Sequence, residues 1–158
     1  MDAVIRYQSA PHPAASGYPL MDVQFIGKYG WAVGAMGTIL RTEDGGQHWV
    51  HIPLSADADL YRVKFVNENE GWAAGEESGW GKRNELMRHD QRGGYGYIYH
   101  TKRRWKNMRI ASSAENGRLL FALDFVNEKI GYASGERGFL LKTIDGGKIG
   151  KHFPRPEH

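Results

Sequence analysis

Short runs in which hydrophobic and polar positions alternate recur along the chain, each ending in glycine or polar turn residues. In LMDVQF (20–25), Val23 and Phe25 share one face of an extended strand, because side chains two residues apart point the same way. The block GWAVG (30–34) is small and apolar, which suits a strand buried on both faces, and its glycines indicate tight turns or close backbone approaches. GTILRT (37–42) supplies the β-branched residues that strands favour. The pattern predicts an all-β protein.

This unit occurs three times. The copies open at Leu20, Leu60 and Leu120, so the intervals are 40 and 60 residues and the second interval contains an insertion. The second copy reads LYRVKF, GWAAG and, after an interruption, GYIYHT; the third reads LFALDF, GYASG and GFLLKT. A fourth strand is expected after Trp49 (VHIP) and after Trp105 (KNMRI). Four strands at this period are typical of a β-propeller blade, so we predict four-stranded antiparallel sheets, about three per chain.

The repeats divide the chain. We assign residues 1–19 to an N-terminal segment, in which Val4–Tyr7 could form the outer strand of a neighbouring blade; 20–57 to blade 1; 58–115 to blade 2 with an insertion at 76–95; and 116–158 to blade 3 and a C-terminal tail. We expect the blade cores to contain the following residues and their equivalents in the other two copies: Leu20, Val23, Phe25, Trp31, Ile39 and Leu40.

The piece TEDGGQHW (42–49) has a physical role of its own between two strands. DGG is a strong hairpin signal: Asp44 can accept hydrogen bonds from turn amides, the glycines can take positive φ, and Trp49 can pack under the turn. It matches the Asp-box pattern Ser/Thr-x-Asp-x-Gly-x-x-Trp. A second box begins in the third copy, where Gly150 replaces the Trp and Phe153 could substitute; in the middle copy the turn is deleted. The residues assigned to the two boxes are Thr42, Asp44, Gly46, Trp49, Thr143, Asp145 and Gly147.

Together, these blocks resemble the BNR/Asp-box repeats of the photosystem II stability/assembly factor family, over residues 20–153. The resemblance implies a β-propeller with structural boxes between the third and fourth strands, in a family that binds other proteins during assembly; a photosynthetic role does not follow from it. Such propellers close with about seven blades, and this sequence holds three repeats. We therefore expect self-association, most simply two copies forming a six-bladed ring. A piece of a longer array is the alternative.

The insertion in the second copy is the most informative departure. Residues 82–109 hold nine basic and two acidic residues, whereas the whole chain has a formal charge of only +3. Arginine and aromatic side chains together favour protein interfaces, and arginine suits carboxylate or phosphate partners. A solvated loop without a partner is the plainer interpretation. The residues predicted to bind a protein partner are Trp80, Arg83, Arg88, Arg92 and Tyr95.

Catalysis is not expected. A sialidase-like site needs an arginine cluster, a Tyr–Glu pair and an acid, but Arg6 is followed by Tyr7 instead of an Arg-Ile-Pro motif, and the neighbouring Glu76 and Glu77 point to opposite sides of a strand. The seven histidines form no close ligand pair and there is no Cys, so we expect no metal and no cofactor. The alternatives are a sialidase-like glycan-binding or glycoside hydrolase fragment, or a single-stranded nucleic-acid binder. No apolar stretch spans a bilayer and no signal sequence is recognisable, so we expect a cytoplasmic protein.

Overall fold

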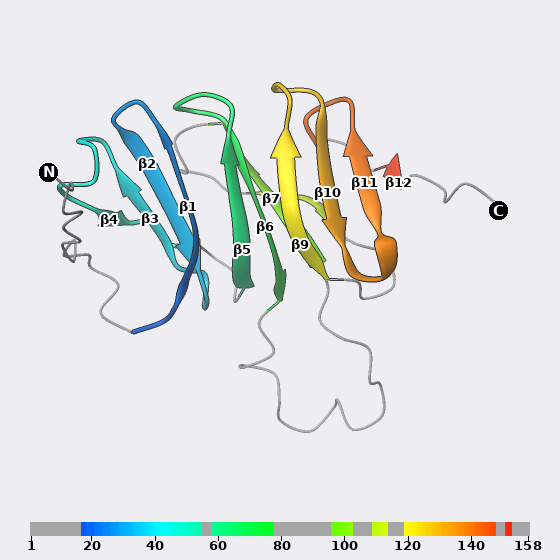
Figure 1. Ribbon diagram of the computed structural model, residues 1–158, viewed down its shortest axis with the longest axis horizontal. Coiled ribbons are helices and arrows are strands. Elements are labelled where there is room, and N and C mark those ends of the chain that lie inside the picture. The colour runs from blue at the N-terminus through cyan, green and yellow to red at the C-terminus, as the bar shows by residue number, and fades with distance from the viewer. Residues whose placement is uncertain are drawn as a thin grey trace, which may run out of the picture.

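The protein is built from three four-stranded antiparallel sheets that stand side by side (Figure 1). The computed structural model describes residues 17–54, 58–77, 96–102, 109–113, 119–147 and 151–152. In each sheet the strands follow one another in chain order, each pairing with the next. The predicted all-β class and the four-stranded antiparallel sheets are confirmed.

The strand bounds show how each repeat becomes one sheet. The first sheet contains β1 (Leu20–Ile26), β2 (Tyr29–Gly34), β3 (Ile39–Thr42) and β4 (Val50–His51). The second contains β5 (Ala58–Phe65), β6 (Gly71–Glu77), β7 (Gly96–Thr101) and β8 (Arg109–Ser113). The third contains β9 (Leu120–Phe125), β10 (Gly131–Gly135), β11 (Leu140–Thr143) and β12 (Lys151–His152), with a short 3-10 turn (Glu136–Gly138) between β10 and β11.

The sheets stack through their faces, with the first strands β1, β5 and β9 adjacent to one another (Figure 1). We call the face that carries Phe25, Phe65 or Phe125 the front face of its sheet, and the opposite face the back face. The back of the first sheet packs on the front of the second, and the back of the second packs on the front of the third. Each repeat thus obtains its core from its neighbour, as expected for a stacked array.

Two glycines in each repeat permit this packing. A Cβ atom on Gly71 would lie 2.6 Å from the ring of Phe65, so the missing side chain lets the phenylalanine lie flat on its own sheet. A Cβ atom on Gly75 would lie 2.1 Å from the carbonyl oxygen of Asp59, where β5 shifts register against β6. Gly30, Gly131, Gly34 and Gly135 show the same two contacts in the other sheets. The close backbone approaches predicted for the GWAxG block are therefore confirmed.

The predicted core is wrong at both ends of the array. In the third sheet Tyr132 and Leu140, the equivalents of Trp31 and Ile39, are 38% and 51% exposed, because no described sheet covers its back. Trp31, Ile39 and Leu40 are buried as expected, but Leu20, Val23 and Phe25 on the front of the first sheet are 42%, 56% and 44% exposed. Their equivalents Leu60, Val63 and Phe65 are at most 5% exposed, because the first sheet covers them. In the described structure no sheet stands in front of β1, so the same motif becomes an open strip along that strand.

Candidate protein-binding surface

The first Asp-box turn connects β3 to β4 and is held by a closed set of hydrogen bonds. The hydroxyl of Thr42 donates to Asp44 (2.7 Å) and accepts from the amide of Gly46 (3.0 Å). The carboxylate of Asp44 also accepts from the amide of His48 (3.0 Å). The indole of Trp49 donates to the carbonyl of Gly46 (3.1 Å), while Gly45 and Gly46 both adopt positive φ. These bonds make the turn a structural element.

The third sheet repeats the turn almost bond for bond. Thr143 donates to Asp145 (2.8 Å) and accepts from the amide of Gly147 (2.7 Å). The amide of Gly146 donates to the carbonyl of Lys129 (2.9 Å), as that of Gly45 does to Lys28. Gly150 and Phe153, at and beyond the place of the missing tryptophan, lie outside the described residues.

The equivalent tryptophans of the first and second sheets differ in their hydrogen bonds. Trp72, on the back of the second sheet, donates its indole N–H to the carbonyl of Gly146 in the box turn of the third sheet (3.1 Å). Trp31 occupies the equivalent position one sheet earlier, and its buried indole nitrogen finds no hydrogen-bond partner among the described residues. The second repeat lacks the Asp-Gly-Gly sequence that would supply that carbonyl.

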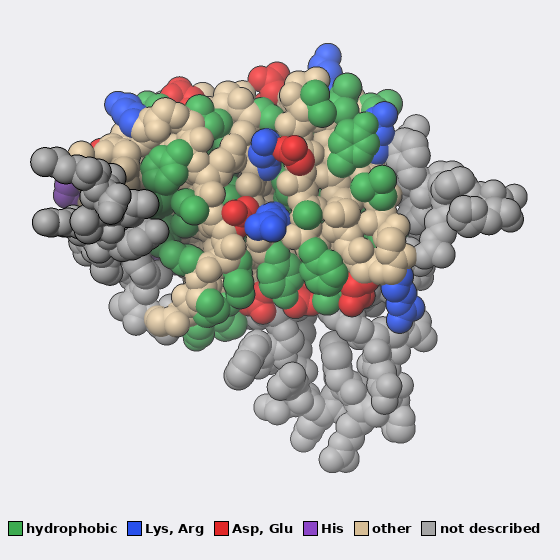
Figure 2. Space-filling model, in the orientation of Figure 1, with side chains coloured by type: hydrophobic (Ala, Val, Ile, Leu, Met, Phe, Trp, Pro, Cys, Tyr) green, Lys and Arg blue, Asp and Glu red, His purple; other side chains and the backbone are tan. Residues whose placement is uncertain are grey.

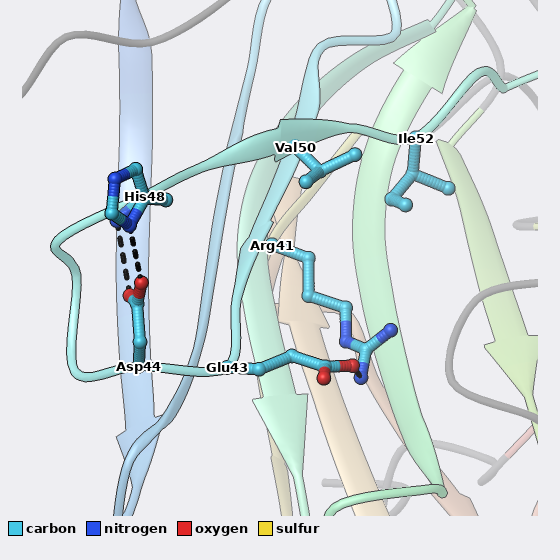
Figure 3. Close-up of a pocket in the computed structure, with 6 residues that line it drawn as sticks. All are labelled: Arg41, Glu43, Asp44, His48, Val50 and Ile52. Atoms are coloured by element: carbon cyan, nitrogen blue, oxygen red, sulfur yellow. Dashed lines mark hydrogen bonds and ion pairs between the residues drawn. The ribbon is translucent and has the colours of Figure 1, made fainter.

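A shallow pocket of about 290 Å³ lies beside the first box (Figure 3). His48 faces the carboxylate of Asp44, and Arg41 pairs with Glu43. The amide of His48, then the hydroxyl of Thr42 and the ring of His48, hold the pKa of Asp44 well below its ordinary value. The hydrogen bonds that lower this pKa all come from the box turn itself, so the carboxylate of Asp44 serves the turn. The residues that line the pocket are Arg41, Glu43, Asp44, His48, Val50 and Ile52.

The adjacent strands β1, β5 and β9 form a second surface, which we call the inner face (Figure 2). Acidic and basic side chains lie in its middle, surrounded by hydrophobic groups. Arg62 approaches Asp22 (3.7 Å), and Lys64 pairs with Asp124 (2.7 Å). The bond from Lys64 lowers the pKa of Asp124. These pairs link neighbouring sheets and leave the middle of the inner face polar.

A hydrophobic rim lies at the end of the inner face where β1, β5 and β9 begin, formed by Met21, Tyr61 and Phe121. The rings of Tyr61 and Phe121 are 6.4 Å apart, and Met21 and Phe121 are exposed. The hydroxyl of Tyr61 donates to Glu76 on β6. Burial, and then this hydrogen bond, raise the pKa of Tyr61 far above its ordinary value, so the hydroxyl keeps its proton. The rim presents aromatic surface held in place from behind.

Sequence reasoning did not single out the rim, because alternation along the strand places its residues elsewhere. All three rim residues occupy the second position of the LxxVxF unit, which has the same parity as the Val and Phe of the unit and is therefore predicted on the core face. In each sheet the register of the first strand shifts at this position, so the residue no longer follows the alternation of Val and Phe. Only the strand pairing reveals this shift.

The insertion is anchored close to this rim. The ladder between β6 and β7 extends to the pair Glu76–Gly96, and Glu76 itself bonds Tyr61. Trp80, Arg83, Arg88, Arg92 and Tyr95, for which partner binding is predicted, lie outside the described residues, as does Val4–Tyr7. Within the described ranges, no group of three or more His, Asp or Glu side chains could hold a metal ion.

Comparison with known proteins places these features in a family. The model of the family described as photosynthesis system II assembly factor YCF48 matches residues 4–82. The photosystem II stability/assembly factor HCF136 of rice is 36% identical over 64 residues, which cover 39% of this chain and 15% of that protein. The protein of the same name in Arabidopsis thaliana is 37% identical over 65 residues, covering 39% of this chain and 16% of its own length. The chain thus spans under a fifth of these relatives.

Solved structures agree on the fold. YCF48 from Cyanidioschyzon merolae has a TM-score of 0.68 at 20% identity, and a YCF48 structure bound to D1 peptide has 0.66 at 21%. The superpositions cover 94% and 85% of this chain, and 40% of each of those chains. A GH74 xyloglucanase from Xanthomonas campestris has a TM-score of 0.57 at 14% identity, covering 81% of this chain and 19% of the enzyme. These likenesses concern the fold alone. In the described part of the chain, no helix has the length and apolar character needed to cross a membrane.

Proposed function

This chain belongs to the photosynthesis system II assembly factor YCF48 family, and from this premise we propose that it is a non-catalytic propeller module that binds a polypeptide partner. The relatives are named as stability or assembly factors, and one solved YCF48 structure holds a D1 peptide. The observation that carries the proposal is the hydrophobic rim, which contacts Glu76 at the point where the insertion leaves β6.

The rim supplies the apolar half of the binding site. Phe121 and Met21 are exposed, and Tyr61 is fixed by its bond to Glu76. Aromatic side chains that are already ordered lose little conformational entropy when a partner covers them, which makes them effective anchors. An extended peptide with apolar side chains would lie along the ends of β5 and β9.

The insertion supplies the charged half. Its three arginines, Arg83, Arg88 and Arg92, are suited to pair with carboxylates of the partner, and Trp80 and Tyr95 add apolar contact at its ends. The first strands begin at the end of the sheet where Glu76 pairs with Gly96, so the described residues that flank the insertion lie at the same end of the sheet as the rim. We infer that the partner segment is apolar and acidic.

A binding titration tests this proposal. We expect a D1 peptide, used as the probe, to bind the full chain, and Phe121→Ser to weaken binding by at least about fivefold, since an aromatic anchor contributes more than about 1 kcal/mol. Replacing Arg83, Arg88 and Arg92 with Gln should weaken binding further and flatten its dependence on salt.

The matched control replaces Lys102, Arg103 and Arg104 with Gln. It removes the same charge from the β7–β8 connection, and binding should change little. Equal losses in the two triple variants would mean that only net charge matters, and binding unchanged by Phe121→Ser would exclude the rim. Single-stranded DNA bound more tightly than the peptide, with a steep fall in salt, would favour the nucleic-acid alternative.

We also infer that the chain self-associates. The strip of Leu20, Val23 and Phe25 is an exposed apolar surface of the kind that marks an interface. In repeat arrays an uncovered end sheet is a liability, because it leaves the same face open that every internal sheet buries.

A further inference from the structure

The two internal interfaces are built on one repeated contact. Trp31 stacks on Phe65 with ring centroids 3.7 Å apart and planes 4° from parallel. Trp72 stacks on Phe125 at 3.6 Å and 10°. Each phenylalanine lies flat on a glycine of its own sheet, Gly71 or Gly131, so its ring is enclosed between its own backbone and the tryptophan of the preceding sheet.

The front of the first sheet carries the phenylalanine of this contact without a stacked tryptophan. Phe25 lies on Gly30 and touches Trp49 edge-on at 5.8 Å. Its ring remains 44% exposed, whereas Phe65 and Phe125 are 1% and 7% exposed. The open strip therefore has the shape and chemistry of an internal front face that no ring covers.

The back of the third sheet carries an aromatic ring at the tryptophan position, without a stacked phenylalanine. Tyr132 occupies the position of Trp31 and Trp72 and is 38% exposed where both tryptophans are fully buried. The amino group of Lys142 lies 5.6 Å from its ring centroid, on the neighbouring strand, as His100 lies against Trp72.

Two aliphatic side chains complete this back face. Leu140 stands at the position of the buried Ile39 and is 51% exposed. Val126 is 73% exposed, and its equivalent Val66 packs against the next sheet. Three positions that are covered at internal interfaces are thus open together at this end.

We propose that the back of the third sheet of one copy docks on the open strip of the first sheet of a second copy, with Tyr132 stacked on Phe25. This deepens, and rests on, the self-association proposed above. The front of the first sheet lacks a covering ring and the back of the third sheet lacks a phenylalanine to stack on. Because each face supplies what the other lacks, a second copy is favoured over an unrelated partner. The contact is head-to-tail, so two copies close into a ring through two identical interfaces.

The Asp box strengthens the match. At the interface of the second and third sheets, Trp72 donates to the box carbonyl of Gly146. The first sheet has a box with the same bonds, and Gly45 stands at the position of Gly146. The hydroxyl of Tyr132 is the donor that would reach this turn. The middle repeat, which lacks the box, could not offer that acceptor.

A complementation experiment tests both the contact and its direction. Sedimentation velocity is measured for the full chain, for Phe25→Asp, for Tyr132→Asp and for an equimolar mixture of the two variants. We expect the wild type to be a dimer and each variant alone a monomer, since every head-to-tail contact then contains one charged partner. The mixture should form a dimer of twice the monomer mass that is weaker than the wild type, because one contact joins intact Phe25 to intact Tyr132 while the second contact contains both substitutions.

Other outcomes overturn the proposal. A wild-type monomer would show that no second copy occupies the strip, and a Tyr132→Asp dimer would mean that the association uses another face. The control is Ile144→Asp, an exposed apolar position filled by Glu43 and Lys102 in the other repeats, which should stay dimeric. Circular dichroism shows whether each variant is folded. D1 peptide titration of the same wild-type sample separates the two proposals. A wild-type monomer that binds the peptide would contradict only the contact between copies. A wild-type dimer that does not bind the peptide would contradict only the proposed peptide site.

Discussion

Strands β1 and β5 carry the same LxxVxF motif, but its apolar side chains are exposed on β1 and buried on β5. Phe65 and Val63 on β5 are buried under the first sheet, while Phe25 and Val23 on β1 face outward. Both phenylalanines lie on a glycine of their own sheet, so their local geometry is alike. The difference is the presence of a sheet in front. In a stacked array, burial belongs to the interface between repeats, and the repeat alone does not determine it.

The largest expected effect comes from removing the two phenylalanines in turn. Phe65→Ala should lower the free energy of unfolding by about 3–5 kcal/mol, because it empties a packed site under Trp31. Phe25→Ala should lower it by about 1 kcal/mol, since its ring is half in solvent. Urea unfolding measures both, in a Tyr132→Asp background that keeps the chain monomeric. Equal losses would mean that β1 is covered in solution by something other than a second copy.

A smaller difference should separate the two tryptophans. Trp72→Phe removes a hydrogen bond and leaves the carbonyl of Gly146 without its donor. Trp31→Phe removes an indole N–H that has no described partner. Trp72→Phe should therefore cost about 1 kcal/mol more than Trp31→Phe. Chemical denaturation of the two variants, which lose similar ring area, gives the difference directly, and a larger loss at Trp31 would reveal an acceptor in the second repeat.

The subtlest effect is a pH dependence that involves the first box. The pKa of Asp44 is lower in the folded chain than the unfolded value of about 3.9, so its ionised form stabilises the fold above that pH. This stabilisation is lost as the pH falls through about 4 toward the folded pKa. Melting temperatures between pH 6 and pH 2 should fall less steeply for Asp44→Asn than for the wild type. Parallel curves would show that the turn does not depend on the charge.

Much of the fold could be predicted from the sequence, because it is encoded locally. The spacing of Val23 and Phe25, the glycines of GWAxG and the turn at Asp44 each act within one sheet. The exposure of Phe25 could not be predicted, since it depends on which sheet stands in front. The Tyr61–Glu76 bond also joins residues on different strands, and only the register of β5 against β6 brings them together.

The residues of the proposed binding site also differ in how far the sequence reveals them. The arginines of the insertion stand out by composition, and their contacts remain a prediction. Phe121 and Met21 are inconspicuous as single residues and become a surface only when the three sheets stand side by side. The register shift at the second position of each first strand, which brings them to this surface, is visible only in the strand pairing.

The base of the β6–β7 hairpin has a consequence for how such a module can change. The ladder runs without a register shift to Glu76–Gly96, so the chain leaves and re-enters the sheet at two hydrogen-bonded neighbours. The corresponding hairpins of the other sheets close at the same level with tight turns through Met36 and Arg137, both at positive φ. Residues 77–95, between these neighbours, therefore lengthen the chain without interrupting the four-stranded sheet. We expect the length of this connection to be adjustable at little cost to the sheet.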